Sequence, residues 1–180
     1  MTATAAAPPR LQPWRLRGTA RRLLRLSHVI AALAWLGVDV VLGVLAVTAF
    51  TSDDPGTIAA CYIALHTFAA PLLLVFGLTT LVTGLVLSIS GGFGLIRYWW
   101  VLVKLVINLI LSGLVLIALQ PRLTDAAAEA TRIDATLIDR LGRIPTDLLF
   151  PAFVSGAAII AASLLGTFKP WGRTPFRRGQ

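Results

Sequence analysis

Four ionisable side chains lie within strongly apolar stretches of this 180-residue sequence: His28, Asp39, His66 and Lys104. An ionisable group inside a membrane is costly, and it usually marks an ion or substrate path, a proton relay or a buried charge pair. A carboxylate and an ammonium can neutralise each other, and a histidine can carry a proton between groups. The first question is therefore which of these side chains meet.

Helical spacing places most of these residues on two faces. One face of a first helix would contain His28, Trp35 and Asp39, and one face of another would contain Trp100, Lys104 and Asn108. If these faces meet, Asp39 should lie at the depth of Asn108, one turn from Lys104. The spacing thus predicts a polar intramembrane cluster of Asp39, Lys104 and Asn108, which either serves a function or only joins the two helices.

His66 is predicted to stand apart. It enters its apolar stretch from the opposite side, at least roughly 15 Å from His28 along the bundle axis, and Tyr62 lies one turn before it. This position favours a histidine at the membrane interface.

Close helix contacts are expected at four glycines, Gly77, Gly84, Gly113 and Gly156.

The composition excludes a soluble globular domain. The chain is 57% hydrophobic and 13% charged, against roughly 45–50% and about 25% in soluble domains. The single cysteine excludes an internal disulfide and a cysteine-based metal cluster, and Met1 is the only methionine. The basic residues do not form a stripe on a polar surface, so no nucleic acid partner is expected.

Four apolar stretches approach or exceed the roughly 20 residues that cross a bilayer core of about 30 Å. The sequence predicts an all-α polytopic bundle with spans at about 28–50, 58–90, 98–119 and 148–168, together forming a domain over 27–168. Basic tails, 1–26 and 169–180, would flank this domain. Pro71 lies inside the second span and predicts a bend there.

The distribution of basic residues predicts the orientation. Eleven of the 16 fall in 1–26, 91–97 and 169–180, whereas four fall in 51–57 and 120–147. Basic segments stay in the cytoplasm, so both termini should be cytoplasmic in a bacterial plasma membrane, with the tails at anionic lipid headgroups. In 120–147 an apolar stripe predicts an extracytoplasmic amphipathic helix: Ile133, Leu137, Leu141 and Ile144.

Two segments carry a family resemblance. HVIAALAWLG at 28–37 and WWVLVKLVINLIL at 99–111 resemble small four-helix bacterial membrane proteins of the CopD-like and HemJ-type groups, and an uncharacterised group related to them. The resemblance implies a b-type haem, with His28 as an iron ligand and Lys104 as the second ligand or a propionate partner. By their positions, two tryptophans are suited to flank this haem and two arginines at the inner interface are suited to hold its propionates: Trp35 and Trp100, and Arg25 and Arg97.

Three functions stay open at this point. One is haem binding with a redox or haem-handling role, and another is a non-enzymatic accessory or assembly subunit, as a homo-oligomer or with a membrane protein partner. The third is a small transporter or proton path through Asp39, His28 and Lys104. No nucleotide loop, nucleophilic triad or metal-hydrolase motif is present. A Lys104 paired with Asp39 stays protonated and cannot bind iron, so the charge pair and iron ligation compete for one side chain.

Overall fold

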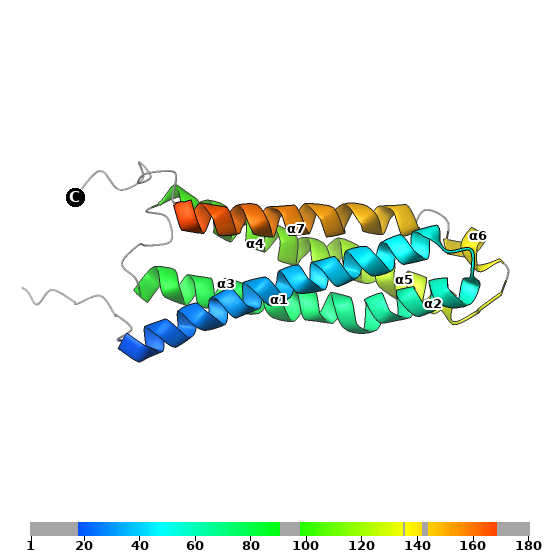
Figure 1. Ribbon diagram of the computed structural model, residues 1–180, viewed down its shortest axis with the longest axis horizontal. Helices are drawn as coiled ribbons and strands as arrows, with labels where there is room; N and C mark the ends of the chain where they lie inside the picture. The colour runs from blue at the N-terminus through cyan, green and yellow to red at the C-terminus, as the bar shows by residue number, and fades with distance from the viewer. Residues whose placement is uncertain (1–17, 91–97, 135, 142–143, 169–180) are drawn as a thin grey trace, which may run out of the picture.

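Long helices run side by side along one axis of the protein (Figure 1). The computed structural model describes residues 18–90, 98–134, 136–141 and 144–168, and within these the chain forms helices and connections without a β-strand. Helix α1 (Gly18–Thr51) begins at the end of the bundle where α7 (Ile144–Phe168) ends. We call this the proximal end, and the opposite end, which carries α6 (Leu137–Leu141), the distal end.

Four segments of the described chain are long and apolar enough to cross a membrane. They are Gly18–Thr51, Pro55–Ser90, Trp99–Ala130 and Phe150–Phe168. This confirms the predicted all-α fold with four spans. Two helices extend further than predicted, since α1 begins at Gly18, inside the predicted tail 1–26, and the third helix continues to Ala130.

Two spans contain a π-helical segment just before a proline. The second span consists of α2 (Pro55–Ala64), η1 (Leu65–Ala69) and α3 (Ala70–Ser90), and the third of α4 (Trp99–Leu114), η2 (Val115–Leu119) and α5 (Gln120–Ala130). Pro71 and Pro121 follow these π segments by two residues. A proline lacks an N–H and crowds the carbonyl four residues before it, and the wider π turn relieves that crowding. The irregularity predicted at Pro71 is therefore a π turn, and Pro121 does not end its helix.

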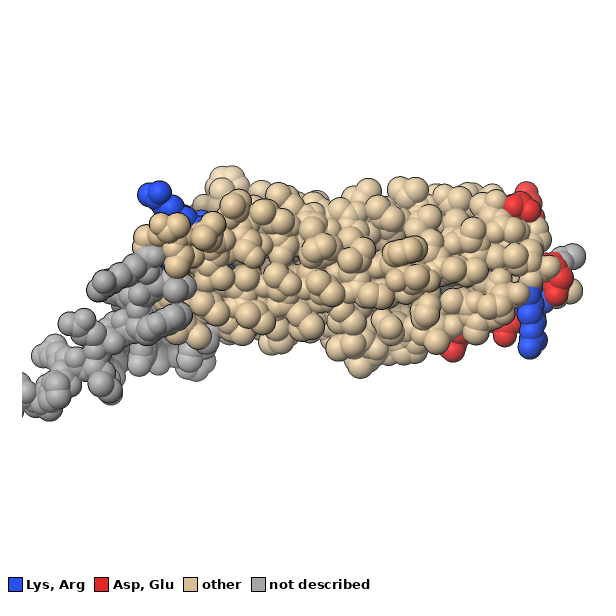
Figure 2. Space-filling view, turned by 90° about the horizontal axis from the view of Figure 1, so that it is seen from below, with Lys and Arg blue, Asp and Glu red and all other residues tan. Residues whose placement is uncertain are grey.

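The surface of the bundle between its ends is apolar. In Figure 2 the visible Lys, Arg, Asp and Glu side chains lie at the two ends, with an uncharged belt between them. Large apolar side chains on this belt are exposed, such as Leu33 at 63% and Ile117 at 78%. An exposed apolar surface of this extent requires a hydrocarbon surrounding, so the protein contacts the lipid bilayer directly.

The connection between the third and fourth spans differs from the prediction. Its first part belongs to α5, and only the short helix α6 follows within the described residues. Leu137 and Leu141 are buried as predicted, but Ile133 is 61% exposed. The π turn carries the third helix past Pro121, so fewer residues are left to form the predicted amphipathic helix.

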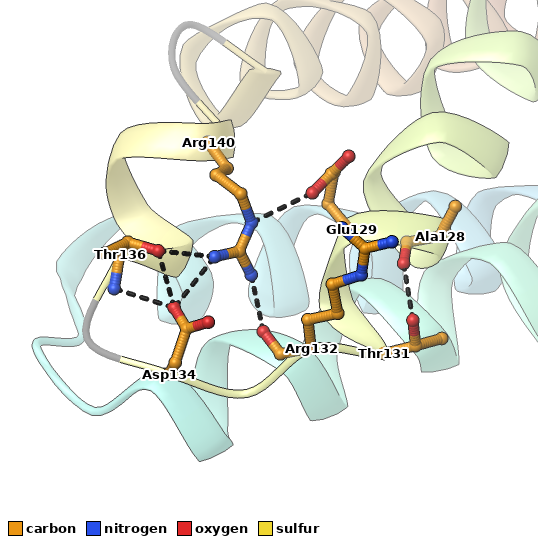
Figure 3. A network of polar contacts seen from close by, with 7 residues as sticks. All are labelled: Ala128, Glu129, Thr131, Arg132, Asp134, Thr136 and Arg140. Atoms are coloured by element: carbon orange, nitrogen blue, oxygen red, sulfur yellow. Dashed lines mark hydrogen bonds and ion pairs between the residues drawn. The ribbon is translucent and has the colours of Figure 1, made fainter.

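Arg140 holds α6 against the end of α5 (Figure 3). Its Nε donates to Glu129 Oε2 at 2.9 Å and its Nη1 to Asp134 Oδ1 at 2.8 Å, while Nη2 donates to the carbonyl of Arg132. The amide and hydroxyl of Thr136 also donate to Asp134 Oδ1. These hydrogen bonds, together with the Arg140 charge, lower the pKa of Asp134 to about 2.

Acid is expected to loosen this distal connection. The pKa of Asp134 lies below the ordinary value of about 3.9, so its contribution to stability is complete above about pH 4 and is lost as the pH falls towards about 2. Hydrogen exchange of residues 131–141, corrected for intrinsic rates, should therefore accelerate over this range. The Asp134→Asn variant should exchange faster at neutral pH and lose the acid response; an unchanged response in this variant would contradict the assignment.

Candidate functional site

A cavity of about 520 Å³ lies among α1, α3, α4 and α7 in the proximal half of the bundle. We call it the proximal cavity. Four of the six residues predicted for the cofactor site line it: His28, Trp35, Trp100 and Lys104. Of the other two, Arg25 is exposed on α1 and does not line the cavity, and Arg97 lies outside the described residues. The fold thus brings together side chains that are up to 76 positions apart.

His28 is oriented by the hydroxyl group of Thr83 on α3. Its Nδ1 lies 2.9 Å from Thr83 Oγ1, and that hydroxyl donates its own proton to the carbonyl of Thr79 at 2.6 Å. Thr83 Oγ1 is therefore the acceptor, which assigns the proton of a neutral His28 to Nδ1. Nε2 then keeps its lone pair, which is the arrangement of a histidine able to bind a metal.

Gly84 makes room for the imidazole of His28. A Cβ atom at Gly84 would lie 3.1 Å from His28 Cε1. Lys104 lies opposite another glycine, because a Cβ atom at Gly166 on α7 would fall within the van der Waals distance of Lys104 Nζ. His28 and Lys104 therefore each pack against a glycine, where the neighbouring helix presents its backbone and no side chain.

The wall of the proximal cavity contains several polar atoms without a partner. Trp35 Nε1 and Thr80 Oγ1 are buried and have no hydrogen-bond partner among the described residues. Within the same part of the chain, Lys104 Nζ forms no hydrogen bond or ion pair, and no Asp or Glu lines the cavity. This wall is suited to a ligand that carries hydrogen-bond acceptors or a negative charge.

Two turns deeper than His28, Trp35 packs against Gly77. Trp35 is 2% exposed, and a Cβ atom at Gly77 would lie 3.1 Å from its ring. Asn108 Nδ2 donates to the Gly77 carbonyl at 3.4 Å and Asn108 Oδ1 accepts from Ser112 at 3.4 Å. Asn108 is thus level with Trp35, and it joins α4 to α3.

Asp39 does not join the predicted cluster. Its Oδ2 accepts a hydrogen bond of 2.8 Å from Ser155 on α7, and no ion pair joins Asp39 to Lys104 in the described chain. Lys104 faces Gly166, which is 11 residues from Ser155 and therefore about 16 Å away along the helix. The axial offset between the helices separates the two charges, so the predicted charge pair with its Asn108 bridge is wrong.

The remaining sequence predictions have mixed outcomes. Gly77 and Gly84 are close contacts, as predicted, whereas a Cβ at Gly113 would meet no atom within 4 Å. His66 lies in η1, half-buried, and does not line the proximal cavity. Helical spacing did not identify Thr83, Gly166 and Ser155 as site residues. Hydroxyl residues and glycines are common in such helices, and these three are distinguished only by their contacts with His28, Lys104 and Asp39.

Among the described residues, no group of three or more His, Cys, Asp or Glu side chains could hold a metal ion. No curated protein and no solved structure matches the chain. One family model does match, over residues 22–170, which include every residue that lines the proximal cavity. The chain therefore belongs to DUF2269, a family described as predicted integral membrane protein.

Proposed function

We propose that this membrane protein binds a b-type haem in the proximal cavity, with His28 as an axial ligand. The observation that carries the proposal is the joint presence of His28, Lys104, Trp35 and Trp100 in the wall of one cavity. Its volume of about 520 Å³ lies within the range of about 300–1,000 Å³ that is usual for small-molecule sites. The resemblance to CopD-like and HemJ-type proteins supplies the identity of the ligand.

The hydrogen bond from His28 to Thr83 supports the role of His28. It leaves Nε2 as the free ring nitrogen, and it restricts rotation of the imidazole. Ligating histidines commonly donate their other N–H in this way. Haem, when bound, supplies one-electron redox chemistry, or it is itself the molecule that the protein handles.

Lys104 is suited to hold a haem carboxylate. A protonated amine can pair with a propionate, and none of the described residues of the cavity wall is an acid that would compete for it. Trp35 Nε1 and Thr80 Oγ1 are further hydrogen-bonding atoms without a partner among the described residues. The tryptophan rings offer flat apolar surfaces beside an apolar macrocycle.

The absorption spectrum of the protein purified in detergent tests haem binding. We expect a Soret band, which His28→Ala should abolish or shift because it removes the axial nitrogen. His66→Ala is the matched control and should leave the band unchanged, since His66 does not line the cavity. A wild-type protein that stays colourless after reconstitution with haem would refute the proposal.

We further propose a bacterial plasma membrane location with both termini in the cytoplasm. The excess of basic residues in 1–26, 91–97 and 169–180 supports this orientation, as does the common end at which α1 begins and α7 ends. In a Cys61→Ala background, an impermeant thiol reagent applied to intact cells should label Pro55→Cys but not Pro175→Cys. The reverse pattern would invert the orientation.

A further inference from the structure

A second cavity, of about 410 Å³, has Asp39 on α1 and Ser155 on α7 in its wall. We call it the distal cavity. Apart from Asp39, Ser155 and Arg122, its wall consists of apolar side chains, among them Leu42, Leu73 and Leu148. The function proposed above uses none of these residues.

The helices around the distal cavity are irregular. The π-helical segment η2 contributes Val115 and Leu119 to the wall, and α7 contributes Pro151 from its interior. A π turn widens the helix, and an internal proline lacks the N–H that would continue the hydrogen-bond ladder. Both features occur in transmembrane helices where a binding site interrupts regular packing.

The distal cavity reaches the lipid-facing surface of the bundle. Three of its lining residues are also exposed: Leu114 at 46%, Phe150 at 72% and Val154 at 41%. A molecule dissolved in the bilayer could therefore enter between α4 and α7. Phe150 also provides an aromatic face, which attracts cations.

Asp39 gives this apolar cavity an uncompensated polar group. The residue is 4% exposed, and Ser155 is the hydrogen-bond partner of Oδ2, whereas Oδ1 has none among the described residues. Among the described residues Arg122 is the other charged residue of the wall, and it has an interaction of its own. A carboxylate buried among apolar side chains requires either a proton or a cation.

We propose that the distal cavity binds a lipophilic organic cation whose charge is neutralised by the Asp39 carboxylate. Under acidic conditions and without the ligand, Asp39 carries a proton on its carboxyl group. Binding of the cation releases this proton, so the carboxylic acid and the cation become an ion pair and a free proton. No electron is transferred. The site is separate from His28 and does not depend on haem.

Binding of tetraphenylphosphonium to the purified full-length protein in lipid nanodiscs tests this inference. We expect saturable binding at about pH 8, and weaker binding with measurable release of protons at about pH 5, where protonation of a carboxyl group competes. Asp39→Asn keeps the shape of the side chain and an acceptor for Ser155. It should weaken binding at about pH 8 by about tenfold or more, and remove most of the pH dependence.

Two further variants separate the site from a general effect on folding. Val154→Trp fills the mouth without changing the charge of Asp39 and should also weaken binding. His28→Ala lies in the proximal cavity and should bind the cation as the wild type does. Unchanged binding in folded Asp39→Asn, unchanged binding in folded Val154→Trp, or a folded wild type without saturable binding would each overturn the proposal. None of these outcomes bears on the Soret band at His28.

Discussion

Replacement of Gly77 by alanine is expected to destabilise the bundle by about 1–3 kcal/mol, the usual cost of overpacking a tight interior. The added Cβ would lie 2.9 Å from Ser112 Oγ and 3.1 Å from the ring of Trp35. The indole ring cannot yield easily, because Trp35 is 2% exposed and enclosed on α1. Thermal unfolding in detergent, followed by circular dichroism, should show the loss as a lower midpoint.

Gly113→Ala provides a matched control for the backbone effect. A Cβ at Gly113 would meet no atom within 4 Å, so alanine there should be neutral or stabilising by up to roughly 1 kcal/mol, as in an ordinary helix interior. The two variants together separate helix propensity from packing. If Gly77→Ala unfolds at the same temperature as Gly113→Ala, Trp35 and Gly77 are not in tight contact.

Truncation of Trp35 to alanine is expected to cause a larger loss, near the lower end of the range of about 3–5 kcal/mol for buried aromatic residues. Trp35 is one of the largest fully buried side chains of the described bundle, and it lines the proximal cavity. The transfer from water that contributes in soluble proteins is small here, since the unfolded helix stays in lipid. The loss of packing contacts applies in lipid as well, and it sets the expected destabilisation.

Trp35→Phe tests which property of the side chain matters. Phenylalanine keeps most of the apolar volume and removes an indole N–H that has no partner among the described residues. In protein prepared without haem, this variant should lose less than about 1.5 kcal/mol. A loss as large as that of Trp35→Ala would show that the N–H group, and not the volume of the ring, stabilises this layer of the bundle.

The two cavities are neighbours within one bundle. Leu111 on α4 lines both of them. The proximal cavity carries His28 and Lys104, and the distal cavity carries Asp39 near the middle of α1. Among the described residues only the distal cavity has a carboxylate in its wall, where Asp39 occurs together with Arg122. For this reason we propose a carboxylate-bearing macrocycle for the proximal cavity and a lipophilic cation for the distal one.

The four spans could be predicted from the sequence because their apolar composition is a local property of each segment. The same is true of the predicted irregularity at Pro71, since a missing N–H acts on its own helix. The extent of the helices was less predictable. The apolar stretch predicted an end of the third span near residue 119, but the π turn before Pro121 lets the third helix continue to Ala130.

By itself, the sequence determined which residues share a helix face, because 3.6 residues per turn place His28 above Trp35 and Trp100 above Lys104. Only the tertiary structure decided which faces meet and at what depth. A helix can slide along its neighbour by a turn without changing its own hydrogen bonds, and packing against glycines and hydroxyls on other helices sets that offset. For this reason His28 faces Thr83 and Gly84, Lys104 faces Gly166, and Asp39 meets Ser155 instead of Lys104.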